Sequence, residues 1–279
     1  MRVRATVDYS MTHILMIIHF YYMTTPPEVI QLLTALLSGI QSRLPGNLAG
    51  LYLRGSLATG DFRPESSDVD LLAVTEREVN DAEFDRLVEF HSTITQQEHP
   101  FATRIEIAYI DRAAIQRFQP GHRFATLGQG HGEKLTWTEH HTNWILERWM
   151  VREQGIALFG PPPKRLIDPI EPAQLTSAVQ ARLQDWAEWA RDLNDPEWQL
   201  PRSHKAYIVE TMCRALYTLG RGEIASKPRS TAWARQYLPE PWRTLVEESQ
   251  SWRTDDTLDP ALIPRVRAFV LWAAEQAAR

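Results

Sequence analysis

Asp68 and Asp70 are the side chains of this chain that are best placed to hold a metal ion. They open the segment 68–74, DVDLLAV, whose apolar run predicts a β-strand. Side chains alternate between the two faces of a strand, so both carboxylates point the same way, roughly 6.6 Å apart along the backbone. Neighbouring carboxylates repel each other unless a cation lies between them, and Mg2+ binds such oxygens together with water and substrate phosphates. The pair therefore predicts a site for a metal ion and a nucleotide.

A glycine and a serine, Gly55 and Ser56, lie upstream of the two aspartates. They follow the short apolar segment 51–53, LYL, which predicts a strand that leads into a turn. A glycine allows the backbone to come close to a phosphate, and a serine at the start of a helical turn offers its N–H and its hydroxyl. Residues 55–56 are therefore a candidate phosphate-binding turn.

A third acidic residue, Glu106, lies in the segment 104–110, RIEIAYI. This segment alternates between polar and apolar residues and predicts a strand next to 68–74, which would bring Glu106 beside the aspartates. Each motif alone has a structural alternative: acidic pairs at strand ends are common in solvated turns, and a glutamate on an amphipathic strand often faces solvent. The Gly-Ser turn at this distance from the aspartates favours the catalytic interpretation.

The composition is that of a globular protein, and its charge balance is compatible with a small, polycationic substrate. The chain has 279 residues, of which 43% are hydrophobic and 23% charged, enough for two modest domains. Its net charge of −5 argues against nucleic acid as the main partner, because binding to a phosphate backbone requires a basic face. The single cysteine, Cys213, excludes an intrachain disulfide bond. We expect a cytoplasmic monomer that does not enter the membrane.

Residues 1–23 are not expected to contribute to function. Their apolar run over 14–22 follows a basic start, but it is too short to span a bilayer and no small-residue cleavage site follows it. Thr25 and Pro26 have the types expected at the beginning of a helix. We therefore expect an over-long gene start or a disordered extension up to residue 23.

The pattern of apolar residues divides the remaining chain into two domains. The first, spanning 24–160, combines the predicted strands with amphipathic helices over 29–44 and 79–98. Within it, residues 112–131 are expected to form an irregular loop, and the Gly-Pro run in 157–163 is the expected boundary. The second domain, spanning 165–279, is expected to be a bundle of helices over 175–193, 204–219, a short stretch near 228, 241–252 and 260–278.

The Gly55-Ser56 turn, the eleven residues after it, the Asp68-x-Asp70 pair and the acidic strand resemble the nucleotidyltransferase superfamily with a DNA polymerase β-like palm. The chain is more closely similar to the aminoglycoside adenylyltransferases that modify streptomycin and spectinomycin, from about Gly46 to the C-terminus. The resemblance implies an α+β fold, in which a nucleotidyltransferase domain with a mixed sheet and helices precedes an all-α helical bundle.

The resemblance also implies ATP as co-substrate and Mg2+ as cofactor. Asp68 and Asp70 would then hold the metal, while Gly55, Ser56 and Ser67 would position the triphosphate. Glu106 would take the proton from the attacking hydroxyl as general base and serve as a further metal ligand. The acceptor would be a small, cationic molecule bound between the domains.

The second half of the resemblance lies in the segment that runs from Arg214 through Ser226-Lys227. Arg214 and Lys227 match family positions that reach the phosphates of ATP, which suits a planar guanidinium and a compact ammonium. Trp252 stands near the position of a family tyrosine that lines the nucleotide. The structural alternative is that Arg214 pairs with Glu210 one helical turn earlier and that Lys227 is solvated.

The chain departs from the family pattern where the acceptor is chosen. His204 and Tyr207 stand near positions where the family has an acid and a histidine, and Asp195, Glu197 and Trp198 are candidates for a different pocket. The acceptor therefore need not be streptomycin or spectinomycin. Two other functions stay open: transfer of a nucleotide to a protein or a tRNA, as in regulatory or toxin–antitoxin nucleotidyltransferases, and nucleotide binding without catalysis.

Overall fold

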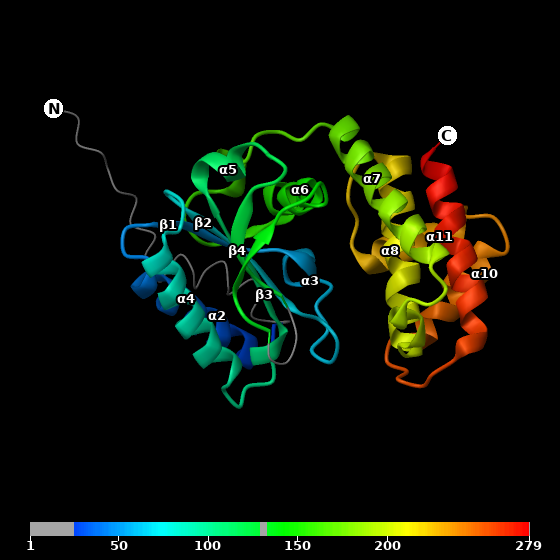
Figure 1. The fold of residues 1–279 in the computed structure, drawn as a ribbon, viewed down its shortest axis with the longest axis horizontal. Coiled ribbons are helices and arrows are strands. Elements are labelled where there is room, and N and C mark those ends of the chain that lie inside the picture. The colour runs from blue at the N-terminus through cyan, green and yellow to red at the C-terminus, as the bar shows by residue number, and fades with distance from the viewer. Residues whose placement is uncertain (1–24, 129–132, 279) are drawn as a thin grey trace. The chain divides into compact units, whose positions relative to one another are not determined.

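The computed structural model of the protein describes residues 25–128 and 133–278 (Figure 1). These residues form two compact units. The first comprises the described residues up to His140 together with Met150–Asp168, and the second comprises His141–Trp149 and the described residues from Pro169 onwards. The expectations for residues 1–23 lie outside the described residues. Within the described ranges, no helix is long and apolar enough to cross a membrane.

A mixed sheet forms the centre of the first unit. Among the described residues it has six strands in the order β5-β4-β3-β2-β1-β6. Strands β2 and β3 run parallel, whereas the other neighbouring strands run antiparallel. The predicted α+β class is therefore confirmed. The strands are β1 (Leu48–Leu53), β2 (Val69–Thr75), β3 (Ile105–Asp111), β4 (Arg123–Leu127), β5 (Thr136–Glu139) and β6 (Ile156–Phe159).

Two amphipathic helices, α2 (Pro27–Arg43) and α4 (Asp81–Thr95), lie side by side against one face of this sheet (Figure 1). Their apolar side chains share one core with Leu71 of β2 and Ile107 of β3, both of which are completely buried. Because side chains alternate along a strand, Asp70 and Glu106 belong to the opposite face. Both predicted helices are confirmed, with α4 starting later than expected because Asn80 caps it by accepting from the Glu83 N–H at 2.9 Å.

The prediction of an irregular loop over residues 112–131 is wrong in part. The segment contains the helix α5 (Arg112–Gln116) and the strand β4. The helix α5 begins there because the Asp111 carboxylate accepts hydrogen bonds from the N–H groups of Ala113 and Ala114, each at 3.0 Å. Both elements have five residues, which is too short for a hydrophobic period to stand out.

The segment 157–163, expected only to end the domain, contains most of the strand β6, which pairs antiparallel with β1. The hydroxyl of Tyr52 on β1 donates to the carbonyl of Pro161 at 2.8 Å and ties the end of the segment to the sheet. Pairing partners that lie so far apart in the chain leave no local pattern, which is why the sequence did not predict this strand.

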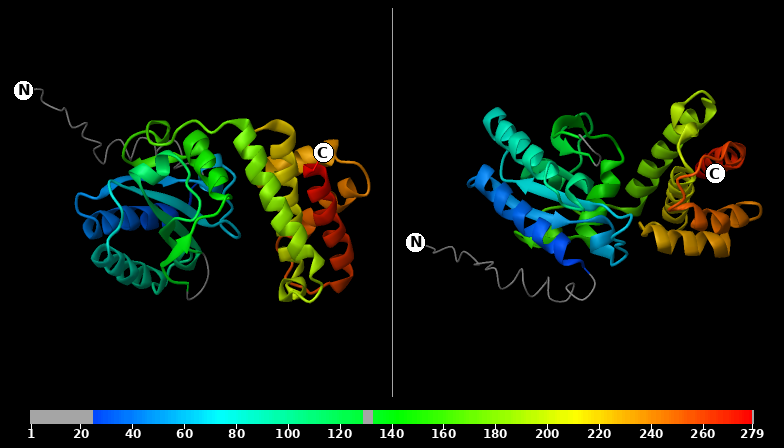
Figure 2. Two further views of the ribbon diagram at one scale, coloured as in Figure 1. Left: turned by 45° about the horizontal axis from the view of Figure 1, so that its top comes forward. Right: turned by 90° about the horizontal axis from the view of Figure 1, so that it is seen from below.

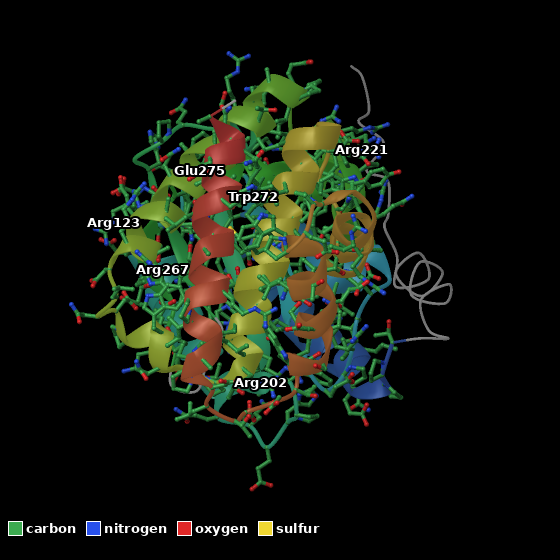
Figure 3. The ribbon with its side chains drawn as sticks, turned by 90° about the vertical axis from the view of Figure 1, so that its right-hand side faces the viewer. Arg123, Arg202, Arg221, Arg267, Trp272 and Glu275 are labelled. Atoms are coloured by element: carbon green, nitrogen blue, oxygen red, sulfur yellow. The ribbon has the colours of Figure 1, made fainter. Side chains whose placement is uncertain are left out.

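The second unit is a helical bundle, and the helices predicted for it are confirmed. Helix α8 carries buried apolar residues along its length, and Gly222, with a φ of 68°, caps its end in the left-handed conformation. Helices α7, α8 and α11 pack on one another (Figure 2), and Arg202 and Arg221 mark the two ends of α8 (Figure 3). The helices are α7 (Pro172–Arg191), α8 (Arg202–Arg221), α9 (Lys227–Tyr237), α10 (Trp242–Ser249) and α11 (Ile263–Ala277).

The remaining helical elements are short or join the units. Helix α6 (Trp144–Gln154) contains residues of both units, and its residue Leu146 packs on the core of the bundle. Helix α3 (Gly55–Thr59) is a single turn that follows β1. The 3-10 turns are Ala102–Arg104, Pro163–Arg165, Pro196–Gln199, Gln250–Trp252 and Pro260–Leu262.

His91 on α4 makes the stability of the first unit depend on pH. Its ring is buried and lies 2.6 Å from the Tyr109 hydroxyl, and burial lowers its pKa to about 3. An unfolded histidine has a pKa of about 6.5, so between these values the unfolded state binds the extra proton. The free energy of unfolding therefore decreases as the pH is lowered from about 6.5 towards 3. We expect the free energy of unfolding to lose about 2–3 kcal/mol between pH 7 and pH 4.5 through this residue.

Urea unfolding at both pH values checks this expectation. His91→Gln should lose less stability than the wild type on acidification, and the exposed His122→Gln should behave like the wild type. An unchanged pH dependence in His91→Gln would contradict it.

Candidate active site

The turn after β1 is built to bring the backbone against Asp70. The N–H of Arg54 donates to the carbonyl of Asp70 at 3.0 Å, which extends the pairing of β1 with β2 up to the turn. Gly55 then adopts a φ of 63° and starts α3. A Cβ atom at this position would lie 2.9 Å from Asp70 Cγ and closer still to Oδ2. Only a glycine fits here, because both the backbone conformation and the closeness of the carboxylate exclude a side chain.

Three carboxylates, those of Asp68, Asp70 and Glu106, lie at the beginnings of the central strands β2 and β3 beside this turn. Asp70 and Glu106 are direct partners in the parallel pairing of β2 with β3. Asp68 lies immediately before β2, two residues from Asp70, while Val69 and Leu71 between and after them are completely buried. The alternation predicted for the aspartates and the position predicted for Glu106 beside Asp70 therefore agree with the strand register.

Arg54 is the member of this cluster that sequence reasoning missed. Its side chain is 6% exposed, its Nη1 lies 3.8 Å from Asp70 Oδ1, and its Nη2 donates to Glu106 Oε1. One guanidinium therefore contacts two of the three carboxylates. The sequence feature that could have pointed to Arg54 is its position as a charged residue directly after the apolar segment 51–53 and directly before Gly55.

A second arginine, Arg104, stands at the outer end of the cluster. Its Nε lies 3.9 Å from Asp68 Oδ1, and its Nη1 and Nη2 donate to the carbonyls of Pro64 and Ser67. Ser67 closes the turn before Asp68, because its hydroxyl accepts from the Arg63 N–H at 2.9 Å. Arg104 therefore ties the 63–67 turn to the start of β3.

Ser56 is half-buried as the second residue of α3. The phosphate-binding roles of Ser56 and Ser67 stay predictions.

The residues fit a magnesium site of two carboxylates better than one of three. Within residues 25–128 and 133–278, no group of three or more His, Cys, Asp or Glu side chains is arranged to hold a metal ion. Mg2+ is usually held by one or two carboxylates, with substrate phosphates and water completing its shell. Asp68 and Asp70 supply oxygen ligands of this kind, and the space left by the missing Cβ of Gly55 adjoins Asp70. Metal binding by Asp68, Asp70 and Glu106 stays a prediction.

In the helical unit, Arg214 and Lys227 both adjoin the segment that links α8 to α9. The Nε of Arg214 donates to the carbonyl of Ala225 at 3.4 Å, and Lys227, which is exposed, begins α9. The Lys227 ammonium lies 5.3 Å from the centre of the Tyr207 ring. Glu210, proposed as a partner of Arg214, forms an ion pair with Arg253. Two cations next to a helix N-terminus are suited to an anionic ligand.

Two tryptophans considered for ligand contact belong to the core of the bundle. Trp252 is 2% exposed and Trp198 is 1% exposed, and both pack in the hydrophobic cluster formed by α7, α8 and α11. Because so little of either ring is exposed, the burial of Trp252 argues against the nucleotide contact predicted for it. Of the other acceptor-site candidates near the start of α8, Glu197 and Tyr207 are exposed, whereas His204 is half-buried, with its Nε2 3.3 Å from Glu197 Oε2.

A Gly-Ser turn held against a row of carboxylates on a mixed sheet is the arrangement of a nucleotidyltransferase, and comparison with known sequences assigns the family. The family model "Nucleotidyltransferase domain" matches residues 33–119, and "Aminoglycoside adenylyltransferase, C-terminal domain" matches residues 165–274. The chain belongs to the aminoglycoside adenylyltransferase family of the nucleotidyltransferase superfamily. It is an enzyme of the adenylyltransferase type.

Named relatives agree with this assignment at low identity. The aminoglycoside (3'') (9) adenylyltransferase of Shigella flexneri is 24% identical over 232 residues, covering 80% of this chain and 84% of the relative. The spectinomycin 9-adenylyltransferase of Staphylococcus aureus is 22% identical over 209 residues, covering 72% of this chain and 76% of the relative. The crystal structure of spectinomycin adenyltransferase AAD(9) from Enterococcus faecialis with ATP and spectinomycin has the same fold, with a TM-score of 0.69 at 14% identity over 90% of this chain and 99% of that one.

Proposed function

We propose that the protein transfers AMP from Mg·ATP to a hydroxyl group of an aminoglycoside-like small molecule and releases pyrophosphate. The observation that carries this proposal is the position of Asp70 and Glu106 as direct neighbours on β2 and β3, beside the Gly55-Ser56 turn, in a chain of this family. The site then contains both groups that the chemistry requires: a metal-binding carboxylate and a base.

Asp68 and Asp70 would bind the nucleotide through Mg2+, which supplies charge neutralisation and polarisation at the phosphates when bound. The Gly55-Ser56 turn would hold the phosphates close to Asp70, because the missing side chain leaves space there. Glu106, whose side chain is 34% exposed, would accept the proton of the acceptor hydroxyl. The hydroxyl oxygen attacks the α-phosphorus, and the bond from that phosphorus to the bridging oxygen of the β-phosphate breaks as pyrophosphate leaves.

The helical unit would supply the positive charge that the carboxylate row, Asp68, Asp70 and Glu106, lacks. A triphosphate brings several negative charges to a site whose own arginines, Arg54 and Arg104, already face carboxylates. Arg214 and Lys227 would neutralise the phosphates and the leaving pyrophosphate. Nucleotide binding would then require both units of the chain.

Replacing Lys227 with alanine tests this role of the helical unit. A charge-assisted contact to phosphate is worth about 1.5–3 kcal/mol, so we expect the dissociation constant of Mg·ATP to rise roughly tenfold to hundredfold. Arg235→Ala, which removes an exposed cation from the same helix, should leave the affinity unchanged because Arg235 lies beside Glu247. Titration calorimetry on the three proteins measures this. Equal affinities would mean that the helical unit is only accessory to nucleotide binding.

The acceptor is proposed from the relatives. Those named above act on aminoglycosides or spectinomycin by name, and AAD(9) was crystallised with ATP and spectinomycin. The net charge of −5 also suits a cationic acceptor. His204 and Tyr207 occupy the region where the family pattern is broken, so an aminoglycoside-like acceptor other than streptomycin or spectinomycin is included in the proposal.

The experiment that tests the function uses ATP labelled on the α-phosphate. The protein is incubated with Mg2+, the labelled ATP and, separately, aminoglycosides, spectinomycin, tRNA or no acceptor. We expect label to move to at least one small molecule. Labelling of the protein itself or of tRNA would replace the proposal by a macromolecular acceptor, and no transfer to any acceptor would favour a binding module.

A further inference from the structure

Arg54 holds an unusual position for an arginine. It follows the buried strand residues Leu51, Tyr52 and Leu53 and is itself 5% exposed. Taking an arginine out of water is costly unless carboxylates compensate its charge, and here Asp70 and Glu106 do so. The fold therefore places a permanently charged side chain between Asp70 and Glu106.

The carboxylates of Asp70 and Glu106 would otherwise require a cation from solution. They lie on directly paired positions of neighbouring strands, which are separated by about 4.8 Å. Two ionised carboxylates at such a spacing repel each other, and enzymes that transfer phosphoryl groups often place two metal ions about 3.5–4 Å apart to neutralise such a site. A guanidinium that contacts both carboxylates performs this neutralisation without a metal.

Resting on the proposed function, we infer that Arg54 takes the place of a second divalent cation, so that the enzyme binds Mg·ATP with one metal ion held by Asp68 and Asp70. Arg54 is then a positioning residue. Its contact with Glu106 Oε1 holds that carboxylate away from the metal and keeps it for the acceptor hydroxyl. A guanidinium suits this purpose because it stays charged at every physiological pH and donates in a fixed plane.

Counting bound Mn2+ ions tests the inference directly. Mn2+ is titrated into the wild type, Arg54→Gln, Arg54→Lys and Arg112→Gln with saturating α,β-methylene-ATP, and free Mn2+ is followed by electron paramagnetic resonance. We expect one ion per protein for the wild type and for Arg54→Lys, which keeps the charge. Arg54→Gln should bind two. Arg112→Gln is the control. This variant loses the same charge as Arg54→Gln, but Arg112 pairs with Glu76, away from Asp68, Asp70 and Glu106.

Thermal unfolding without nucleotide gives a second readout. Arg54→Gln should melt several degrees below the wild type, because two carboxylates lose their counter-ion. Mn2+ should recover more of the melting temperature in this variant than it adds to the wild type. A merely structural role of Arg54 would give the loss without the recovery or the second ion.

The outcomes separate this inference from the proposed function. Two Mn2+ ions on the wild type, or a single ion on a folded Arg54→Gln without recovery by Mn2+, would overturn the inference and leave the proposed function standing. No Mn2+ bound with the nucleotide on the wild type would overturn both. If Arg54→Gln does not fold, the counts for the wild type and Arg54→Lys decide, and two ions on either would overturn the inference.

Discussion

Asp70→Asn should reduce nucleotidyl transfer to background while the protein stays folded. The amide keeps the shape of the carboxylate, so it fits against Gly55 as Asp70 does. It loses the negative charge that the proposed metal site requires, so the Mg2+ of Mg·ATP would lose one of its two carboxylate ligands on the protein. Because Arg54 Nη1 lies 3.8 Å from Asp70 Oδ1, the change removes an attraction to Arg54 together with a repulsion from Glu106, so the melting temperature should move little.

The control for this variant is Asp85→Asn, which removes the same charge from the exposed side of α4. Rates of pyrophosphate release and melting temperatures are measured on all three proteins. Near wild-type turnover by Asp70→Asn would show that the metal assignment is wrong. An unfolded variant would be replaced by Asp68→Asn, which lies before β2 and is expected to lose activity for the same reason.

Glu106→Gln should lower turnover about 10²–10⁴-fold, the usual worth of a general base. The glutamine keeps an oxygen that accepts from Arg54, so the geometry around Arg54 should survive. The affinity for Mg·ATP should change little, because the inferred role of Glu106 is toward the acceptor hydroxyl. Single-turnover rates and calorimetry separate the two quantities.

Glu76→Gln serves as the matched control, since Glu76 is paired with Arg112 outside the carboxylate row. Should Glu106→Gln lose nucleotide affinity while its single-turnover rate is preserved, Glu106 would be a metal ligand and not the base.

The long elements of the fold were predictable because their hydrophobic period is strong. Helices α2, α4, α7, α8 and α11 each present a stripe of buried residues, and β2 and β3 alternate clearly. The strand β6 was not predictable, because its pairing with β1 joins residues such as Tyr52 and Ala157 that share no local pattern. The short elements α5 and β4 were missed for lack of length.

The candidate site shows the same division. The spacing of Asp68 and Asp70 and the alternation around Glu106 predict which side chains share a face, since these properties are local to each strand. The role of Arg54 depends on the order of β1, β2 and β3 in the sheet, which no spacing in the sequence states. Trp252 illustrates the converse, because a tryptophan that fills a helical core and one that lines a pocket look alike in sequence.

Phosphorus NMR of the complete reaction tests the proposed chemistry most directly. The protein is mixed with Mg2+, ATP and an acceptor that takes up label, and the spectrum is recorded as ATP disappears. Attack at the α-phosphorus predicts a phosphodiester signal from the adenylylated acceptor and a pyrophosphate signal in equal amounts. A phosphomonoester with ADP would mean attack at the γ-phosphorus, and hydrolysis of ATP without a modified acceptor would mean no transfer; either result would contradict the proposal.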